Sequence, residues 1–157
     1  PEPYIPKNGA RIMSLQDPSS KMSKSDANEN GFVAMTDAPD AIMRKFRRAV
    51  TDSEACVRAS EDKPGVTNLM AIYSAFTGKS FDEIEREFDG RGYGDFKEAV
   101  GQSVTEALAP IQAEQKRYLA DKAYLDSILK SGAEKAGYMA RKTLSKVYRK
   151  IGFYQGL

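Results

Sequence analysis

The chain has 157 residues, with 24 Lys and Arg against 22 Asp and Glu, one Cys and no His. Catalytic triads, most zinc sites and His-based acid–base catalysis require an imidazole, so the chain taken alone excludes them. It offers no internal disulfide, no apolar run of membrane-spanning length and no signal-like start, so we expect a cytoplasmic protein without membrane contact.

Two short strands and a polar loop are predicted near the start of the chain. Residues 1–11 contain three prolines and one glycine, which is typical of an extended lead-in. Residues 12–15 alternate like a short strand, and residues 31–35 offer a second one. Between them, residues 17–28 are small, polar and turn-rich, so we expect a mobile surface loop, here called the Ser/Lys loop.

The rest of the chain is predicted to be helical. Asp37 is a suitable N-cap with Pro39 in the first turn, and Ile42 and Phe46 then begin an apolar face at helical spacing. Glycines and an aspartate mark the joints between the later helices. These are expected from about residue 66 to the stop at Gly78, from Ser80 to the break at Gly90, over 95–120 with a kink at Pro110, over 122–130, and over 133–151 after a break at Gly132.

The last predicted helix has two distinct faces. Its apolar face, expected to pack in a core, consists of Ala136, Ala140, Leu144, Val147 and Ile151. Its basic stripe consists of Lys135, Lys142, Lys146 and Arg149. Residues 106–157 carry ten basic and five acidic side chains. Charge alone leaves two interpretations open, a nucleic-acid surface and an ordinary solvated helix face.

The Ser/Lys loop has the groups that a triphosphate requires. Lys21 and Lys24 lie three residues apart among serines. Lysines can neutralise the charge that grows on a departing pyrophosphate, while hydroxyls and exposed backbone amides donate to phosphate oxygens. Loops of this composition are usually linkers, so composition alone is weak evidence for phosphate binding.

The literal order of residues in the loop is more specific. Residues 21–25 read Lys-Met-Ser-Lys-Ser, which matches the KMSKS signature of class I aminoacyl-tRNA synthetases. The surrounding sequence resembles the tryptophanyl-tRNA synthetases of bacterial type over nearly the whole chain. The resemblance is carried by residues 9–15, 25–53, 65–69, 93–97 and 151–153.

This resemblance implies a role for each residue of the motif. The loop would close over ATP, with Lys21 and Lys24 serving the phosphates and Met22, Ser23 and Ser25 shaping the loop. Ile12 would touch the adenine through its backbone. The implied reaction is attack of the tryptophan carboxylate on the α-phosphate of ATP, supplied with Mg²⁺ as substrate, followed by transfer to tRNA(Trp). No protein-bound metal is implied.

Much of the family is not matched by this chain. The histidine-bearing HIGH signature, the tryptophan pocket and the dimer interface of the homodimeric family all lie N-terminal to the loop. We therefore interpret the chain as a mainly α C-terminal portion that is inactive alone. Residues 1–36 would be the edge of a Rossmann-like α/β catalytic domain, and residues 37–157 a helical bundle that contacts the tRNA anticodon.

That interpretation favours a tRNA surface in the basic C-terminal third. The candidate contacts, chosen by charge and placement, are Lys116, Arg117, Lys122, Lys142, Lys146 and Arg149. Three alternatives stay open: a free-standing helical RNA-binding module, a relative of the tyrosyl type, and a purely structural helical domain with an accidental loop. The sequence of residues 9–15 and the form of the motif favour a tryptophan enzyme over a tyrosine enzyme.

Overall fold

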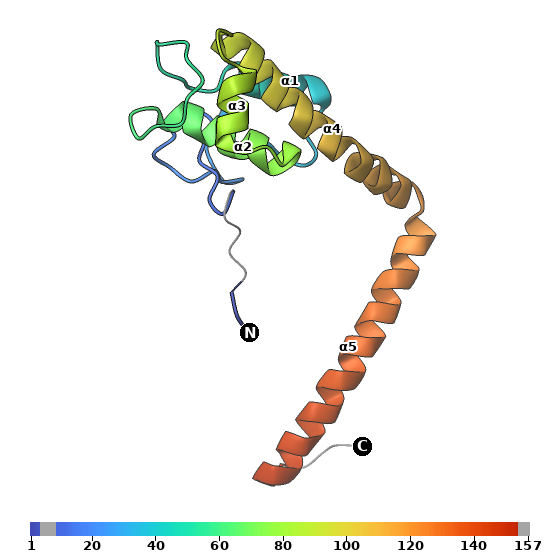
Figure 1. Ribbon diagram of the computed structural model, residues 1–157. Coiled ribbons are helices and arrows are strands. Elements are labelled where there is room, and N and C mark those ends of the chain that lie inside the picture. The colour runs from blue at the N-terminus through green and yellow to red at the C-terminus, as the bar shows by residue number, and fades with distance from the viewer. Residues whose placement is uncertain (4–8, 154–157) are drawn as a thin grey trace. The chain divides into compact units, whose positions relative to one another are not determined.

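The computed structural model describes residues 1–3 and 9–153 (Figure 1). Residues 4–8 of the predicted lead-in lie outside the described residues. The elements are the 3-10 helix η1 (Glu29–Gly31) and the α-helices α1 (Pro39–Arg47), α2 (Pro64–Thr77), α3 (Phe81–Glu87), α4 (Tyr93–Ala120) and α5 (Lys122–Ile151). The expected mainly α fold class is confirmed. Among the described residues, no helix is both long and apolar enough to cross a membrane.

The chain divides by its internal contacts into two compact units, Pro1–Gln112 and Ala113–Leu157. The Ser/Lys loop thus shares a unit with α1, α2 and α3. The side chain of Gln112 donates to the backbone oxygens of Met35 and Asp37, both at 2.9 Å, which closes this first unit. The division after residue 36, drawn from the sequence, concerns the domains of a longer protein and stays a prediction.

The first unit has a hydrophobic core to which all four of its α-helices contribute. Tyr73, Phe88 and Phe96 meet edge to face, with ring centroids 5.0–6.1 Å apart. Each fully buried side chain of this size stabilises the fold by about 1.5–3 kcal/mol relative to exposure. Core side chains with at most 1% exposure include Ile42 and Phe46 of α1, Leu69 of α2, Ile84 of α3 and Phe96 of α4.

Several local signals in the sequence act as predicted. Gly78 ends α2 in the left-handed conformation, at φ 75°. Ser80 caps α3 and exchanges hydrogen bonds with Glu83 in a capping box. The predicted N-cap of α1 is wrong. Ala38 holds that position without a side-chain cap, because the Asp37 carboxylate accepts from the backbone of Ala34 and binds the buried Lys45 ammonium group at 2.7 Å.

Neither predicted strand forms. Met13 makes one isolated antiparallel bridge with Lys21, and the described residues contain no longer ladder. Gly31 belongs to η1, and Phe32 continues in an extended conformation after it. Strands need a hydrogen-bonded neighbour along their length, and here the backbone of residues 12–15 is shared among several partners instead. Leu15 donates to Gly31 and accepts from Val50.

The second unit is dominated by α5. The predicted break at Gly132 is wrong, because α5 runs without interruption from Lys122 to Ile151. A glycine in an exposed helix costs only about 1 kcal/mol relative to alanine, which the flanking helix formers offset. Asp121 caps the helix, and Tyr118 stacks on Tyr124 with ring centroids 5.8 Å apart.

The predicted core face of α5 is also wrong for this chain. No described residue of α5 is buried, and Leu144, Val147 and Ile151 are 45–54% exposed. The periodic pattern does predict an apolar face. A pattern does not specify what covers that face, and the second unit does not bury it.

Candidate functional site

A short antiparallel pairing joins residues 12–14 to residues 20–22 of the Ser/Lys loop. Ser14 donates its N–H to Ser20 at 2.8 Å, and Met22 donates to the carbonyl of Ile12 at 3.0 Å. These two bonds flank the bridge between Met13 and Lys21. They join Ile12 directly to the Lys-Met-Ser-Lys-Ser motif, so the structure brings these predicted site residues together.

Asp17 fixes the first turn of the loop. Its carboxylate accepts from the hydroxyls of Ser19 and Ser20, both at 2.6 Å, and from the backbone of Ser19 at 3.1 Å. The hydrogen bond from the Ser19 hydroxyl, followed by those from Ser20 and the Ser19 backbone, lowers the pKa of Asp17. Its negative charge is therefore committed to the turn, and the chain reverses direction just before Lys21.

The tip of the motif is open to solvent. Lys21, Ser23, Lys24 and Ser25 are exposed. Among the residues that the structure describes, neither lysine forms an ion pair with a carboxylate. The backbone of the tip is nevertheless shaped, because the Ser23 hydroxyl accepts from the Ser25 N–H at 3.2 Å. The arrangement offers two ammonium groups and several hydroxyls to an anion.

Met22 and Ile12 face the opposite way, into an apolar cavity of about 360 Å³ in the first unit. The cavity is also lined by Val33, Ile72 and Phe76. Both Met22 and Ile12 are half-buried and pack against the hydrophobic core. The loop is therefore amphipathic, with its charged side chains outward and its apolar ones anchored.

Helix α2 supports the base of the loop through a residue that the sequence analysis did not single out. The Met13 N–H donates to the side-chain oxygen of Asn68, and the Asn68 amide donates back to the Met13 carbonyl, both at 2.8 Å. Asn68 falls within the matched segment 65–69, which was the only signal for it. A second close approach lies beside it, because a Cβ built on Gly65 would come within 2.3 Å of the Val50 carbonyl oxygen.

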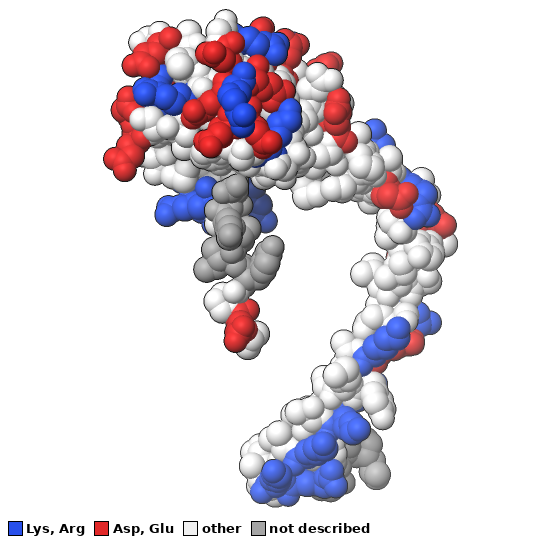
Figure 2. Space-filling model, in the orientation of Figure 1, with Lys and Arg blue, Asp and Glu red and all other residues white. Residues whose placement is uncertain are grey.

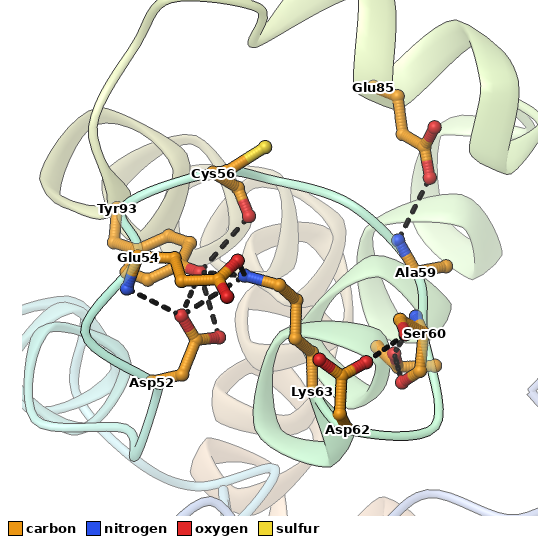
Figure 3. Close-up of polar contacts among 10 residues, drawn as sticks. Asp52, Glu54, Cys56, Ala59, Ser60, Asp62, Lys63, Glu85 and Tyr93 are labelled. Carbon is orange, nitrogen blue, oxygen red and sulfur yellow. Dashed lines mark hydrogen bonds and ion pairs between the residues drawn. The ribbon is translucent and has the colours of Figure 1, made fainter.

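The segment that joins α1 to α2 is held by an ionic network (Figure 3). The Lys63 ammonium group, on a side chain only 1% exposed, lies 2.6 Å from Glu54 and 3.1 Å from Asp52. The Tyr93 hydroxyl oxygen lies 3.2 Å from the Lys63 ammonium group, 2.7 Å from an Asp52 carboxylate oxygen and 3.0 Å from the Cys56 carbonyl oxygen. Figure 3 shows the lysine head enclosed between the two carboxylates and the phenol.

The network shifts the titration of its members. Burial opposes ionisation of Asp52, but hydrogen bonds from Tyr93, the Glu54 backbone and Lys63 prevail and lower its pKa to about 2. The hydrogen bond to Glu54, with those to Tyr93 and Asp52, raises the pKa of Lys63 despite its burial. Asp52 and Lys63 are therefore both ionised at neutral pH, and the network fixes the linker that precedes Gly65 and Asn68.

The candidate tRNA contacts fall into two groups in the second unit. Lys142, Lys146 and Arg149 are exposed at steps of four and three, which places them on one face of α5. Figure 2 shows basic side chains gathered at that end of α5. Lys116 and Arg117 lie in the last turns of α4, and Lys122 begins α5. The 20 residues of helix between Lys122 and Lys142 span about 30 Å. The structure does not bring the two groups together.

Within the described residues, Arg117 is the one candidate that forms an ion pair with a carboxylate. Its guanidinium contacts Glu114 at 2.7 Å and lies over the Tyr118 ring, 4.3 Å from the centroid. The hydrogen bond to Glu114 raises the pKa of Arg117, and the same contact lowers that of Glu114. No group of three or more metal-ligating side chains occurs in the described ranges, 1–3 and 9–153.

Sequence and fold both match known proteins. A family model described as tRNA synthetases class I (W and Y) matches residues 1–109. The tryptophan–tRNA ligase of Clostridium tetani is 54% identical over 153 residues, which are 98% of this chain and 45% of that protein. The crystal structure of tryptophanyl-tRNA synthetase from Mycoplasma pneumoniae is similar with a TM-score of 0.74 and 31% identity, over 95% of this chain and 45% of that one.

A second solved structure is similar to the same extent. The tryptophanyl-tRNA synthetase from Campylobacter jejuni, complexed with ADP and tryptophan, has a TM-score of 0.74 and 25% identity. The match covers 98% of this chain and 47% of that one. The chain thus spans less than half the length of the proteins it matches.

Proposed function

The chain belongs to the class I tRNA synthetases for tryptophan and tyrosine, and from this premise we propose that it is the C-terminal portion of a tryptophan–tRNA ligase. The whole enzyme would activate tryptophan with ATP and charge tRNA(Trp) in the cytoplasm, as a homodimer whose interface lies outside this chain. The portion alone would be inactive, because the resemblance assigns the HIGH histidines and the tryptophan pocket to the other half. The exposed Lys-Met-Ser-Lys-Ser loop is the observation that carries the proposal.

In the proposed reaction the tryptophan carboxylate attacks the α-phosphorus of ATP. A carboxylate oxygen–phosphorus bond forms, the bond from the α-phosphorus to the bridging oxygen breaks, and pyrophosphate leaves with the bond electrons. Lys21 and Lys24 would neutralise the charge that accumulates on the leaving group, with Lys24 the main contributor. Their ammonium groups are exposed and, within the described residues, have no competing carboxylate.

The remaining residues of the motif would hold the nucleotide. Ser23 and Ser25 can donate hydroxyl hydrogen bonds to phosphate oxygens, and Met22 anchors the loop in the apolar cavity. Ile12 would present its backbone to the adenine. Mg²⁺ would arrive with ATP as part of the substrate. The Campylobacter jejuni synthetase was solved with ADP and tryptophan, which supports this choice of ligands.

The second unit would supply the tRNA contact. Its basic candidates are solvent-exposed, and phosphate contacts by lysine and arginine supply sequence-independent affinity. Lys142, Lys146 and Arg149 share one face, so they can follow a phosphate backbone together. Arg117 would first have to leave Glu114, so we expect it to contribute less than the other five candidates.

The loop assignment is tested in the full-length protein that carries this chain, by tryptophan-dependent exchange of pyrophosphate into ATP. Lys24→Ala should slow exchange by on the order of 10²-fold or more, the scale of removing one preorganised electrostatic donor. Tryptophan binding at equilibrium should change far less. Lys130→Ala, an exposed change in α5, is the matched control. Unchanged exchange in Lys24→Ala, or exchange that depends on tyrosine instead of tryptophan, would overturn the proposal.

A further inference from the structure

The backbone of Met13 has two hydrogen-bonding edges, and only one of them faces the Ser/Lys loop. The bonds on either side of the bridge, from Ser14 to Ser20 and from Met22 to Ile12, make Met13 and Lys21 a non-hydrogen-bonded antiparallel pair. In such a pair the N–H and C=O of each residue point away from the partner segment. In a sheet, a third strand would bind those two groups of Met13.

The side chain of Asn68 takes the place of that third strand. Its oxygen accepts from the Met13 N–H and its NH₂ group donates to the Met13 carbonyl, both at 2.8 Å. A carboxamide is suited to this, since it carries one acceptor and one donor side by side. Only one orientation of the amide satisfies both bonds, so its assignment follows from the contacts themselves.

Asn68 is itself immobilised by the core. It is 6% exposed and lies on α2 between Val66 and Leu69, which are 0% and 1% exposed. A buried, doubly bonded amide has no alternative partner in water, so losing either bond is costly. The position of α2 therefore determines the position of the Met13 peptide, which pairs with Lys21. Met13 and Asn68 are 55 residues apart in the sequence.

We propose that Asn68 is a positioning residue for the Ser/Lys loop and acts through the main chain of Met13. This inference rests on the proposed function. By fixing residues 12–14, Asn68 sets the position of the Lys21 backbone and the position of the Ile12 carbonyl. Lys24 follows three residues later, in the turn that the hydrogen bond from the Asp26 N–H to the Ser23 carbonyl closes. Displacement of a catalytic group by about 1 Å can cost on the order of 10²-fold in rate.

The test compares two buried polar residues of α2 in the full-length protein. Asn68→Ala removes the Met13 clamp. Ser74→Ala is the matched control, because Ser74 is also buried and bonds the Lys79 carbonyl at 2.6 Å, away from the loop. Both variants should unfold at lower denaturant concentration than the parent. Only Asn68→Ala should lower kcat/KM for ATP in pyrophosphate exchange, by about 10- to 100-fold, with tryptophan affinity kept within about twofold.

Two further measurements keep the test decisive if Asn68→Ala does not fold. Asn68→Asp has the same size and keeps the acceptor, but it sets a carboxylate oxygen against the Met13 carbonyl, so we expect a similar loss. In the parent protein, the Met13 amide should exchange with solvent on the order of 10²-fold more slowly than the exposed Lys24 amide, because it is hydrogen-bonded to a buried group.

The possible outcomes distinguish a failure of this inference from a failure of the proposed function. A parent protein without tryptophan-dependent exchange would overturn the proposed function. A parent with exchange, but with equal kinetics in Asn68→Ala and Ser74→Ala, would overturn the role of Asn68 alone. Equal exchange rates of the Met13 and Lys24 amides would do the same.

Discussion

The Tyr93 hydroxyl lies 2.7 Å from one carboxylate oxygen of Asp52 and 2.8 Å from the other. This contact ties the first residue of α4 to the linker that follows α1, 41 residues earlier. Lys63 completes the group, so one cation and one phenol stabilise the ionised carboxylate. The linker that supports α2 is therefore held by charge as well as by packing.

The stability contributed by Asp52 should depend on pH. Its pKa falls from 3.8 to about 2 in the folded state, so its contribution is present above about pH 4 and is lost as the pH falls towards 2. Asp52→Asn should lower the free energy of unfolding by about 1–2 kcal/mol near pH 6, after allowance for partial solvent exposure. Urea unfolding of the full-length protein between pH 2.5 and 6 should show this difference shrinking with acidity. Asp89→Asn, at an exposed acid, should show no such trend, and a constant difference for Asp52→Asn would contradict the prediction.

Gly65 should not tolerate a side chain. A Cβ there would come within 2.3 Å of the Val50 carbonyl oxygen, and a backbone atom cannot move aside as a flexible side chain can. We expect Gly65→Ala to destabilise the protein by about 1–3 kcal/mol through overpacking. Gly94→Ala is the control, since nothing lies within 4 Å of its Cβ position and alanine favours helices. Equal unfolding midpoints for the two variants would show that α2 does not approach Val50 this closely.

The basic stripe should contribute a salt-dependent part of tRNA affinity. Each lysine–phosphate contact adds about 0.7–0.9 to the slope of log affinity against log salt concentration. The double variant Lys142→Glu/Lys146→Glu should therefore bind tRNA(Trp) more weakly and with a slope smaller by about 1.4–1.8. Lys142→Arg/Lys146→Arg keeps both charges and should match the parent. Parallel salt dependences for the Glu variant and the parent would remove this face of α5 from the interface.

Local sequence signals predicted much of the fold. Gly78 and Ser80 mark a helix end and a helix start because their preferences depend only on neighbouring residues. The strand predicted from the alternation of residues 12–15 does not form, because a strand depends on a distant backbone partner. Here the partners are mostly a side chain and single backbone groups. The predicted break at Gly132 is wrong because the modest cost of a glycine in a helix is offset along a helix of 30 residues.

The same distinction applies to the candidate site. The motif at residues 21–25 identified the loop, since its identity lies in the local order of residues. The clamp by Asn68 joins residues 55 positions apart and leaves no local pattern. Likewise the raised pKa of Lys63 depends on Glu54, Tyr93 and Asp52 together, which meet only after folding.

The Met13–Asn68 contact also constrains how such a protein can be divided or recombined. The predicted helical domain begins at residue 37, which would suggest a crossover between residues 36 and 64. Such a crossover would take the Ser/Lys loop from one parent and Asn68 from another. Chimaeras of related synthetases should keep residues 12–25 and 65–68 from one parent. A crossover point is therefore better placed after α2, so that the Ser/Lys loop and α2 come from the same parent.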